Sequence, residues 1–286
     1  MRVLVTGAGS IVGRRAEHLH EGGFDVVGTV HSSRIDAPFT TVQLDLAEPW
    51  LEMGSFDAIV HVAGSLPYRE KHFCVYLRNN VDVMRRLIDY ARHHNVRRVI
   101  YFSSLGIYGE IRDESIDENS DRINPDAYGL TKYAAECLLR EETSIQSISL
   151  RMPGIIGSAY RGIWLPNTIE KFRRNEAVRI YSPDFATRNF VWNDDLANFV
   201  VHLLRMETWE YDVVCLAAHE KITVRAGVLY CPAGGTSGSF LFRCVSDECP
   251  VLPSEWNGRK HFYAGALCCF ADFYYFCPIY DRQIDS

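Results

Sequence analysis

Residues 2–13 decide the fold and read Arg2-Val3-Leu4-Val5-Thr6-Gly7-Ala8-Gly9-Ser10-Ile11-Val12-Gly13. The first five residues form a short apolar run, which is typical of a buried parallel strand. A glycine turn follows, and apolar residues then recur at helical spacing until Gly22. This order predicts a dinucleotide-binding entrance, because small residues let the backbone approach a pyrophosphate at a helix N-terminus. A tight strand-to-helix turn without a ligand is the alternative.

Strands and helices continue to alternate along the chain. Strand-like apolar runs lie at residues 25–30, 39–44, 57–62, 99–102 and 147–150. The pattern predicts an α/β fold, namely a doubly wound parallel sheet (Rossmann fold) with a smaller C-terminal substrate lobe. We expect a dinucleotide-binding domain over residues 1–150 and an interleaved substrate-binding lobe over residues 151–286. Ligands of such sheets bind at the carboxyl ends of the strands.

Composition and charge narrow the classes of protein. The chain has 286 residues, of which 47% are hydrophobic, and this suffices for one large domain with a lobe or for two domains. A net charge of −6 argues against a nucleic-acid binder, because such proteins carry a basic surplus. The first residues lead directly into a strand without a targeting signal, so we expect a cytoplasmic protein with no membrane partner.

One helix is predicted to carry acid–base chemistry. Asn124 is expected to cap it, with Pro125 at the first helical position and Asp126 at the positive end of its dipole. Tyr128 and Lys132 are i and i+4, so they project from one helix face. A nearby cation lowers the pKa of a phenol, which could then take the proton of a substrate alcohol. A chance Tyr-x-x-x-Lys pair is the alternative.

The segment after the second strand bears on the choice of cofactor. The segment after the second strand, which contains His31, Ser32 and Arg34, offers hydrogen-bond donors where NAD-binding proteins usually place an acid. Donors suit a 2′-phosphate, so the sequence favours NADP over NAD; solvated loop residues are the alternative.

His61 lies in an apolar run and is predicted to be a hydrogen-bonded core histidine rather than a ligand.

A resemblance to a known family rests on several motifs taken together. They are Thr6-Gly7-Ala8-Gly9 with Gly13, Asp45-Leu46, His61-Val62-Ala63-Gly64, Asn79-Asn80-Val81, Ser103-Ser104-x-x-x-Tyr108-Gly109, Tyr128-x-x-x-Lys132, Arg151-x-Pro153 and Arg188-x-Phe190-Val191-x-x-Asp194-Asp195. In this order and spacing, over roughly the first 205 residues, the chain resembles the extended short-chain dehydrogenase/reductase family, in particular the NAD-dependent epimerases and dehydratases of nucleotide sugars.

The resemblance implies roles for particular residues. Tyr128 would be the acid–base group, Lys132 would lower its pKa and hold the nicotinamide ribose, and Ser104 would orient the substrate oxygen. Arg188 would clamp the substrate diphosphate, for which a guanidinium is suited. The residues expected to bind the cofactor are Gly7, Gly9, Ser10, Ile11, Val12, Gly13, His31, Ser32, Arg34, Asp45, Leu46, Val62, Ala63, Gly64, Asn79, Tyr128, Lys132 and Pro153.

Three departures from the family pattern matter. Ser10 stands where the glycine turn usually has glycine, and the acid after the second strand is missing. Leu105-Gly106 replace the Asp-Glu pair of sugar 4,6-dehydratases, which disfavours water elimination. Epimerisation remains the first expectation and NADPH-dependent reduction of a keto-sugar the second. A non-catalytic dinucleotide-binding protein is the alternative from another class.

Family members often form homodimers through helices like those at residues 79–94 and 126–143, so the resemblance implies a homodimer.

The tail beyond about residue 225 differs from the rest. Residues 226–286 contain 12 aromatic residues and six of the nine cysteines, and they show no family motif. It could be a divergent lobe, or the product of a shifted reading frame that prevents closure of the protein. Metal binding by Cys231, Cys244, Cys249 and His261 fits no known spacing, and Asp272 argues against a membrane helix, so we expect neither.

Overall fold

The structure, a computed structural model, describes the chain in nine segments. They are residues 1–10, 12–32, 34–67, 72–112, 115–156, 186–187, 190–218, 222–223 and 242–244, and for 186–187, 222–223 and 242–244 it describes the backbone alone. Two predicted site residues, Ile11 and Arg188, lie outside these segments. Most of residues 151–286, over which the substrate-binding lobe is expected, also lie outside these segments, including the cysteine-rich tail apart from residues 242–244.

A mostly parallel sheet forms the centre of the molecule. Its strands are β1 (Arg2–Thr6), β2 (Asp25–Val30), β3 (Thr40–Gln43), β4 (Ala58–His61), β5 (Arg98–Ser104), β6 (Gln146–Met152), β10 (Val213–Ala218) and β12 (Phe242–Cys244). They lie in the order β12-β10-β6-β5-β4-β1-β2-β3, and only β12 is antiparallel to its neighbour. The order reverses at β1, where a doubly wound sheet binds its ligand. The predicted fold class is confirmed.

Helices and short strand pairs complete the described part. The helical segments are η1 (Gly13–Arg15), α1 (Ala16–Glu21), α2 (Phe73–Tyr76), η2 (Leu77–Asp82), α3 (Val83–His93), η3 (Leu105–Tyr108), α4 (Ala127–Glu141) and α6 (Asn193–Arg205). Two strand pairs lie apart from the main sheet: β7 (Gly154–Ile156) with β9 (Phe190–Trp192), and β8 (Ala186–Thr187) with β11 (Ile222–Thr223).

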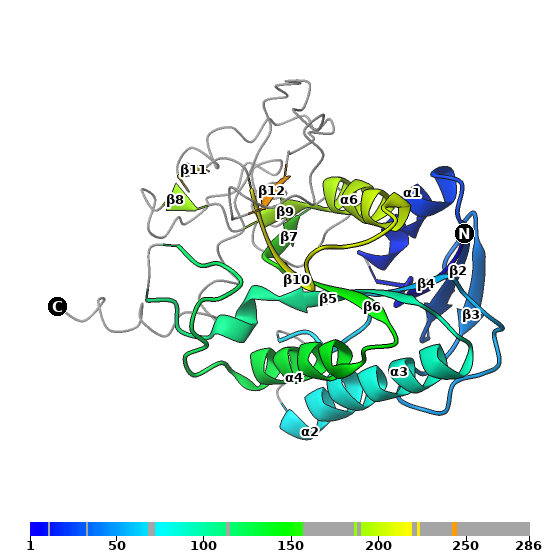
Figure 1. The fold of residues 1–286 in the computed structure, drawn as a ribbon, viewed down its shortest axis with the longest axis horizontal. Helices are drawn as coiled ribbons and strands as arrows, with labels where there is room; N and C mark the ends of the chain where they lie inside the picture. Colours follow the sequence, from blue (N-terminus) through cyan, green and yellow to red (C-terminus); the bar gives the residue numbers. More distant parts are fainter. Residues whose placement is uncertain are drawn as a thin grey trace, which may run out of the picture.

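Helices cover both faces of the sheet (Figure 1). α1 and α6 pack on one face, and α3 and α4 pack on the other. Successive strand residues point to opposite faces, so Val3 and Val5 belong to the core under α1 and α6, whereas Leu4 belongs to the core under α3 and α4. Burial on both faces explains why these strands are continuous apolar runs.

Two predicted helix starts were wrong. The helix expected to open at Asn79-Asn80 begins at Phe73, and these asparagines lie inside the π-helical turn η2. The helix expected to be capped by Asn124 begins later, because Asp126 is the cap and its carboxylate accepts a 2.7 Å hydrogen bond from the N–H of Gly129. Asn124 instead has a positive φ of 47° and bonds Glu110.

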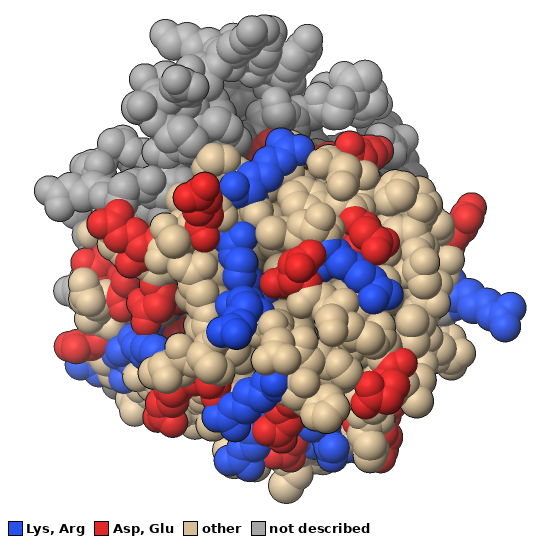
Figure 2. All heavy atoms as spheres, turned by 45° about the vertical axis from the view of Figure 1, so that its right-hand side comes forward, with Lys and Arg blue, Asp and Glu red and all other residues tan. Residues whose placement is uncertain are grey.

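The surface carries charges of both signs. On the face drawn in Figure 2, Lys and Arg side chains lie interspersed with Asp and Glu side chains. Such mixing gives no broad basic area on that face, in line with the acidic net charge of −6. Among the described residues, no helix has both the length and the apolar character needed to cross a bilayer.

Candidate active site

The glycine turn after β1 packs against the end of β4. Gly7 has a φ of +73°, and a Cβ added there would lie 2.9 Å from the Cα of Ala63, so this position requires glycine. A Cβ on Gly13 would lie 2.1 Å from the carbonyl oxygen of Gly7. Gly9 is different, because the nearest atom to an added Cβ would be a Val30 methyl at 3.6 Å. The internal packing therefore accounts for Gly7 and Gly13, whereas it would admit a side chain at Gly9.

Ser10 closes the turn in place of the usual glycine. Its hydroxyl accepts a 2.9 Å hydrogen bond from the N–H of Gly13, and its own N–H donates to the Gly7 carbonyl at 2.9 Å. The hydroxyl thus takes one of the N–H groups that a helix start leaves unpaired. This departure from the family pattern is accommodated within the turn, and the helical segment begins there as the short η1.

Close packing brings α4 to the end of β5. A Cβ on Gly129 would lie 2.2 Å from the carbonyl oxygen of Gly106, so glycine beside Tyr128 lets α4 touch the turn that follows Ser104. Ser104 is the last residue of β5, and its Oγ accepts a 3.0 Å hydrogen bond from the N–H of Gly106. Ser104 and Tyr128 therefore come from adjoining elements at the carboxyl edge of the sheet.

Lys132 is buried one turn after Tyr128. Its ammonium donates a 2.6 Å hydrogen bond to the carbonyl of Phe102 and lies 4.6 Å from the centre of the Tyr101 ring. Burial lowers the pKa of Lys132 from 10.5 to about 7, and the carboxylate of Glu136 acts in the opposite direction. The amine is thus fixed in place and titrates near neutral pH.

Tyr128 lies among aromatic and buried groups. It is 7% exposed, and the Tyr76 ring of α2 is tilted against it with 6.0 Å between centroids. Beneath Lys132, Tyr101 stacks on His61, whose Nδ1 shares a 2.7 Å hydrogen bond with the Thr6 hydroxyl. Burial first and the Lys132 charge second lower the pKa of His61 to about 3, so this imidazole is neutral. The predicted core histidine is confirmed.

The two asparagines of η2 hold the loop after β4. Asn79 donates from its side-chain amide to the Ser65 hydroxyl at 2.9 Å. Asn80 is buried, accepts from the Ser65 N–H at 2.9 Å, and donates to the Thr131 hydroxyl on α4 at 3.0 Å. A Cβ on Gly64 would lie 2.9 Å from the Asn80 Oδ1 and 3.5 Å from the Lys132 Nζ, so this loop runs beside the lysine. Gly64 therefore lies beside Lys132, and the cofactor contacts expected of Val62, Ala63 and Gly64 stay a prediction.

The segment after β2 lies beside Asp45. The Asp45 carboxylate is 3.7 Å from His31 Nε2 and 3.9 Å from a guanidinium nitrogen of Arg78, which also pairs with Glu48 at 2.7 Å. Ser32 and Arg34 are exposed at the same edge, and Leu46 follows Asp45. A carboxylate therefore stands next to the loop in which the sequence lacked an acid. Pro153, at the end of β6, is buried.

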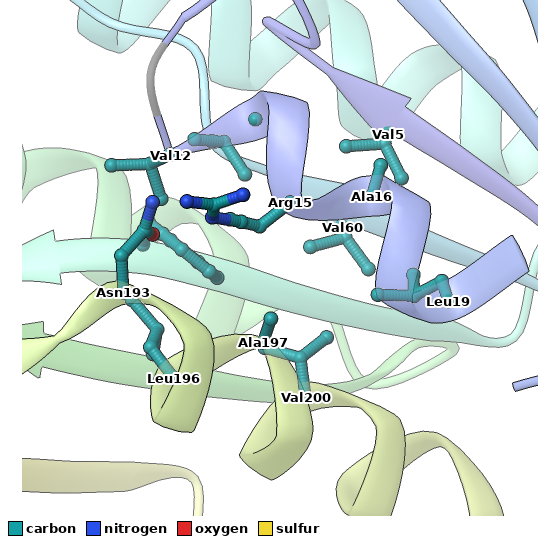
Figure 3. Close-up of a pocket in the computed structure, with 13 residues that line it drawn as sticks. Val5, Val12, Arg15, Ala16, Leu19, Val60, Asn193, Leu196, Ala197 and Val200 are labelled. Carbon is teal, nitrogen blue, oxygen red and sulfur yellow. The ribbon is translucent and has the colours of Figure 1, made fainter. Parts of the chain in front are cut away.

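A small cavity of about 20 Å³ lies between α1, α6 and the sheet, next to Gly13 of the glycine turn. It is lined mainly by aliphatic side chains, and Figure 3 shows Arg15 of η1 and Asn193 of α6 reaching toward each other. Arg15 forms an ion pair with Asp194 across this junction, with 2.7 Å between Nε and Oδ1. The pair joins η1 to the start of α6, which contains two acids of the last predicted motif.

Comparison with known proteins agrees with this geometry. The family model described as "NAD dependent epimerase/dehydratase family" matches residues 3–215. The chain belongs to the NAD-dependent epimerase/dehydratase family. The matched range spans β1 to β10 and so contains the glycine turn, α4 and the main sheet.

Relatives of this epimerase/dehydratase chain act on nucleotide sugars, as their names state. The UDP-glucose 4-epimerase of Streptomyces lividans is 25% identical over 249 residues, which cover 75% of this chain and 74% of the relative. The uncharacterized UDP-glucose epimerase YtcB of Bacillus subtilis is 23% identical over 230 residues, with coverages of 71% and 72%. The structure of MoeE5 with UDP-glucuronic acid and NAD is 25% identical, with a TM-score of 0.69 and coverages of 78% and 79%.

The fold is shared with more distant members. The UDP-N-acetylglucosamine 4-epimerase of Methanobrevibacter ruminantium is 20% identical with a TM-score of 0.70, and the alignment covers 80% of each chain. At this identity the likeness shows a common fold.

Sequence reasoning missed the buried charges beside the site of this family member. Arg151 and Glu136 are each 1% exposed and form an ion pair with 2.8 Å between Nη2 and Oε2. Arg151 also donates to the Tyr108 hydroxyl at 2.6 Å and to the Glu118 carbonyl at 2.8 Å. One signal was available, because Glu136 follows Lys132 by four residues on the same face as the buried Ala135 and Leu139.

Proposed function

We propose that the protein is a nucleotide-sugar epimerase that works through a keto-sugar intermediate, with Tyr128, Lys132 and Ser104 as its catalytic residues. One observation carries the proposal: α4 holds Tyr128 and the hydrogen-bonded Lys132 one turn apart and packs on the turn after Ser104. Membership of the epimerase/dehydratase family supports it. UDP-hexoses are the proposed substrates, because the named relatives are UDP-glucose epimerases.

The residues around the glycine turn fit a dinucleotide. Gly9 leaves the backbone open, and the proposed contacts to the pyrophosphate come from residues 7–13, including Ile11. Asp45 and Leu46 would hold the adenosine end, while Val62, Ala63, Gly64, Asn79 and Pro153 would line the nicotinamide end. When bound, the nicotinamide would accept hydride from the sugar carbon and return it.

Each of the three catalytic residues has a separate task. Tyr128 takes the hydroxyl proton as the substrate is oxidised and returns it afterwards. Lys132 supplies a positive charge that favours the phenolate of Tyr128. Ser104 orients the oxygen with its hydroxyl, and Arg188 binds the diphosphate, so that the sugar carbon is held in position.

Replacing Tyr128 by Phe tests the proposal. We expect turnover of UDP-glucose to fall by about 10²- to 10⁴-fold, because general acid–base catalysis contributes that much, while NAD binding stays unchanged. Tyr133→Phe on the same helix is the matched control, since that partly buried ring packs under Arg122 and against the apolar cluster that contains Ile107. Full activity of the Tyr128→Phe variant would refute the role of Tyr128. Binding of NAD without turnover of any UDP-sugar by the unmodified protein would support the non-catalytic dinucleotide-binding alternative.

The identity of the dinucleotide is the finer part of the proposal. We propose NAD as the bound form, because MoeE5 was solved with NAD and because Asp45 places a carboxylate 3.7 Å from His31, where it would repel a 2′-phosphate. The NADP preference expected from His31, Ser32 and Arg34 stays a prediction. Titration with NADH and NADPH, followed by nicotinamide fluorescence, decides between them. Tighter NADPH binding, with net consumption of NADPH by a keto-sugar, would support the reductase alternative.

Assembly and location are also proposals. A homodimer through the helices at residues 79–94 and 126–143 is supported by the exposed apolar side chain of Leu130 on α4. Light scattering of the purified protein, compared with a Leu130→Glu variant, tests this. The interleaved lobe over residues 151–286 is proposed to bind the sugar nucleotide, and the protein is proposed to work in the cytoplasm.

A further inference from the structure

We propose that Glu52, His93 and His94 form a binding site for a divalent transition-metal ion, with Zn²⁺ as the expected ion. The three residues each offer one ligand atom, and these atoms lie within 4.8 Å of one another. This site is independent of the proposed epimerase activity. It lies at the end of α3 that precedes the start of β5, and Ser104 lies at the other end of that strand.

The donor set is the kind that zinc uses. Two imidazole nitrogens and one carboxylate form a recurrent zinc ligand set, in which water takes the remaining position. The His94 Nε2 and the Glu52 Oε2 are already 3.3 Å apart, close to the separation of two ligands on one tetrahedral ion. His93 and Glu52 are exposed, so their side chains can adjust by rotation to complete the geometry.

Packing holds the two parts of the site together before an ion binds. The His94 ring lies against Tyr90, with 4.3 Å between centroids, and is only 11% exposed. The Tyr90 hydroxyl donates to the carbonyl of Gly54 at 2.6 Å, and Trp50 packs on the same ring at 5.3 Å. The segment that carries Glu52 is therefore anchored on both sides to the last turn of α3, which reduces the ordering cost of binding.

Local electrostatics favour a cation here. His93 is the last residue of α3 and His94 its C-cap, where the helix dipole is negative. Two cations lie nearby, and both are directed toward groups other than Glu52. Arg92 is paired with Asp89 and with Glu142, while Arg2 is paired with Asp25 and donates to the Ser55 carbonyl. A bound ion would add a link between residues 50–54 and α3, and so would stabilise the folded chain.

The test is titration of the full-length protein with Zn²⁺ at pH 7.5 by calorimetry, alongside titration with Cu²⁺ monitored by tryptophan fluorescence. We expect saturable Zn²⁺ binding and a rise in Tm with Zn²⁺. Loss of a direct ligand should weaken binding by at least about tenfold, since even outer-shell partners cost that much. His93→Ala, His94→Gln and Glu52→Gln should each do so, whereas His20→Ala, an exposed histidine on α1, should not.

Local quenching separates this site from zinc binding elsewhere, including the cysteines of the tail. Cu²⁺ at the site should quench Trp50, and the Trp50→Phe variant should lose that quenching while keeping Zn²⁺ affinity. Equal Zn²⁺ affinity in the wild type and in a His93→Ala/His94→Gln double variant would overturn the proposal, as would absence of saturable binding. Turnover should be the same in all these variants, because the site lies away from Ser104.

Discussion

The two faces of the sheet are held by different kinds of contact. The face under α3 and α4 contains three fully buried charged side chains, Lys132, Glu136 and Arg151. On the face under α1 and α6, the core is aliphatic and aromatic, with a small cavity and a half-buried ion pair between Arg15 and Asp194. The difference lies in side chains of both layers, because Lys132 and Glu136 come from α4 whereas Arg151 comes from β6.

The face with more buried charges is the one that carries the proposed catalytic residues Tyr128 and Lys132. A buried charge lowers the stability of the fold unless it is paired, and α4 nevertheless buries charged side chains on the face that carries Tyr128. Glu136 stands between two cations, because it pairs with Arg151 and also acts on Lys132, whose pKa it raises against the effect of burial. On the α1–α6 face, the described residues include one buried carboxylate, Asp195, near the start of α6. The polar contacts between the two helical segments include the Arg15–Asp194 ion pair and a 3.0 Å hydrogen bond from Arg205 to the Gly22 carbonyl.

The largest effect is expected from breaking the buried pair on the α4 face. Glu136→Leu or Arg151→Met alone should lower the free energy of unfolding by about 3–5 kcal/mol, because each leaves an uncompensated buried charge. The double variant should lose less than the sum of the two, since an apolar pair of similar volume carries no stranded charge. Urea unfolding of the four proteins measures the coupling.

A matched variant on the other face sharpens the comparison. Leu203→Ala removes a fully buried aliphatic side chain of α6 and should cost about 2–5 kcal/mol. That loss should add to the loss from Glu136→Leu, because the two side chains lie on opposite faces of the sheet. Additive losses in the Glu136→Leu/Arg151→Met pair as well would contradict the account of a coupled charge pair.

The second effect is a pH dependence that only the α4 face should show. The pKa of Lys132 falls from 10.5 in the unfolded chain to about 7 in the fold, so between these values the unfolded chain binds more protons. Stability should therefore rise with pH from about 7, by up to roughly 1.4 kcal/mol per pH unit. Lys132→Met should remove this rise. The measurement is urea unfolding of the cofactor-free protein from pH 7 to 8.5.

The measurement ends at pH 8.5 because a second buried group, Cys215, affects stability at higher pH. Burial raises the pKa of the Cys215 thiol from 9 to about 12, which acts in the opposite direction once the unfolded thiol ionises. The wild type and Lys132→Met share this term, so their difference isolates Lys132. An equal slope in both proteins would mean that burial does not lower the pKa of Lys132 in the fold.

The sequence predicted the elements whose signal is local. β1 and β2 have the predicted bounds, because a buried parallel strand is a run of apolar residues that ends at a turn. The glycine turn lies where Gly7 and Gly13 allow it, and Ser104 ends its strand as expected. For the candidate site, the spacing of Tyr128 and Lys132 predicted their shared face on α4, since i and i+4 residues share a face in any helix, and their catalytic roles stay a prediction.

The features that the sequence left hidden depend on contacts between distant residues. Arg151 and Glu136 are 15 residues apart, and their pairing follows from α4 lying on β6, which no local pattern encodes. The π-helical turn that contains Asn79 and Asn80 is stabilised by bonds to Ser65 and Thr131. Asp126 rather than Asn124 caps α4, because the Asn124 side chain donates its hydrogen bond to the Glu110 carboxylate.

The cap of α4 offers the next test in size. Asp126→Ala removes the 2.7 Å hydrogen bond to the N–H of Gly129 and should lower the free energy of unfolding by about 1 kcal/mol. Asn124→Ala is the control, and it should cost less if Asp126 is the cap. Because Tyr128 lies in the first turn, Asp126→Ala should also reduce turnover more than it reduces NAD binding. The reverse ranking of the two variants would restore Asn124 as the cap.

The smallest effect is expected at the ion pair on the other face. Arg15→Met keeps much of the side-chain volume beside the cavity but removes the 2.7 Å contact with Asp194. Both side chains are partly exposed, at 20% and 33%, so the loss should be about 0.5–1 kcal/mol at low salt and smaller in 1 M NaCl. Loss of the Glu136–Arg151 pair should resist salt, because both side chains are buried. Urea unfolding of both variants at two salt concentrations therefore tests the contrast between the faces directly, and an equal salt dependence would contradict it.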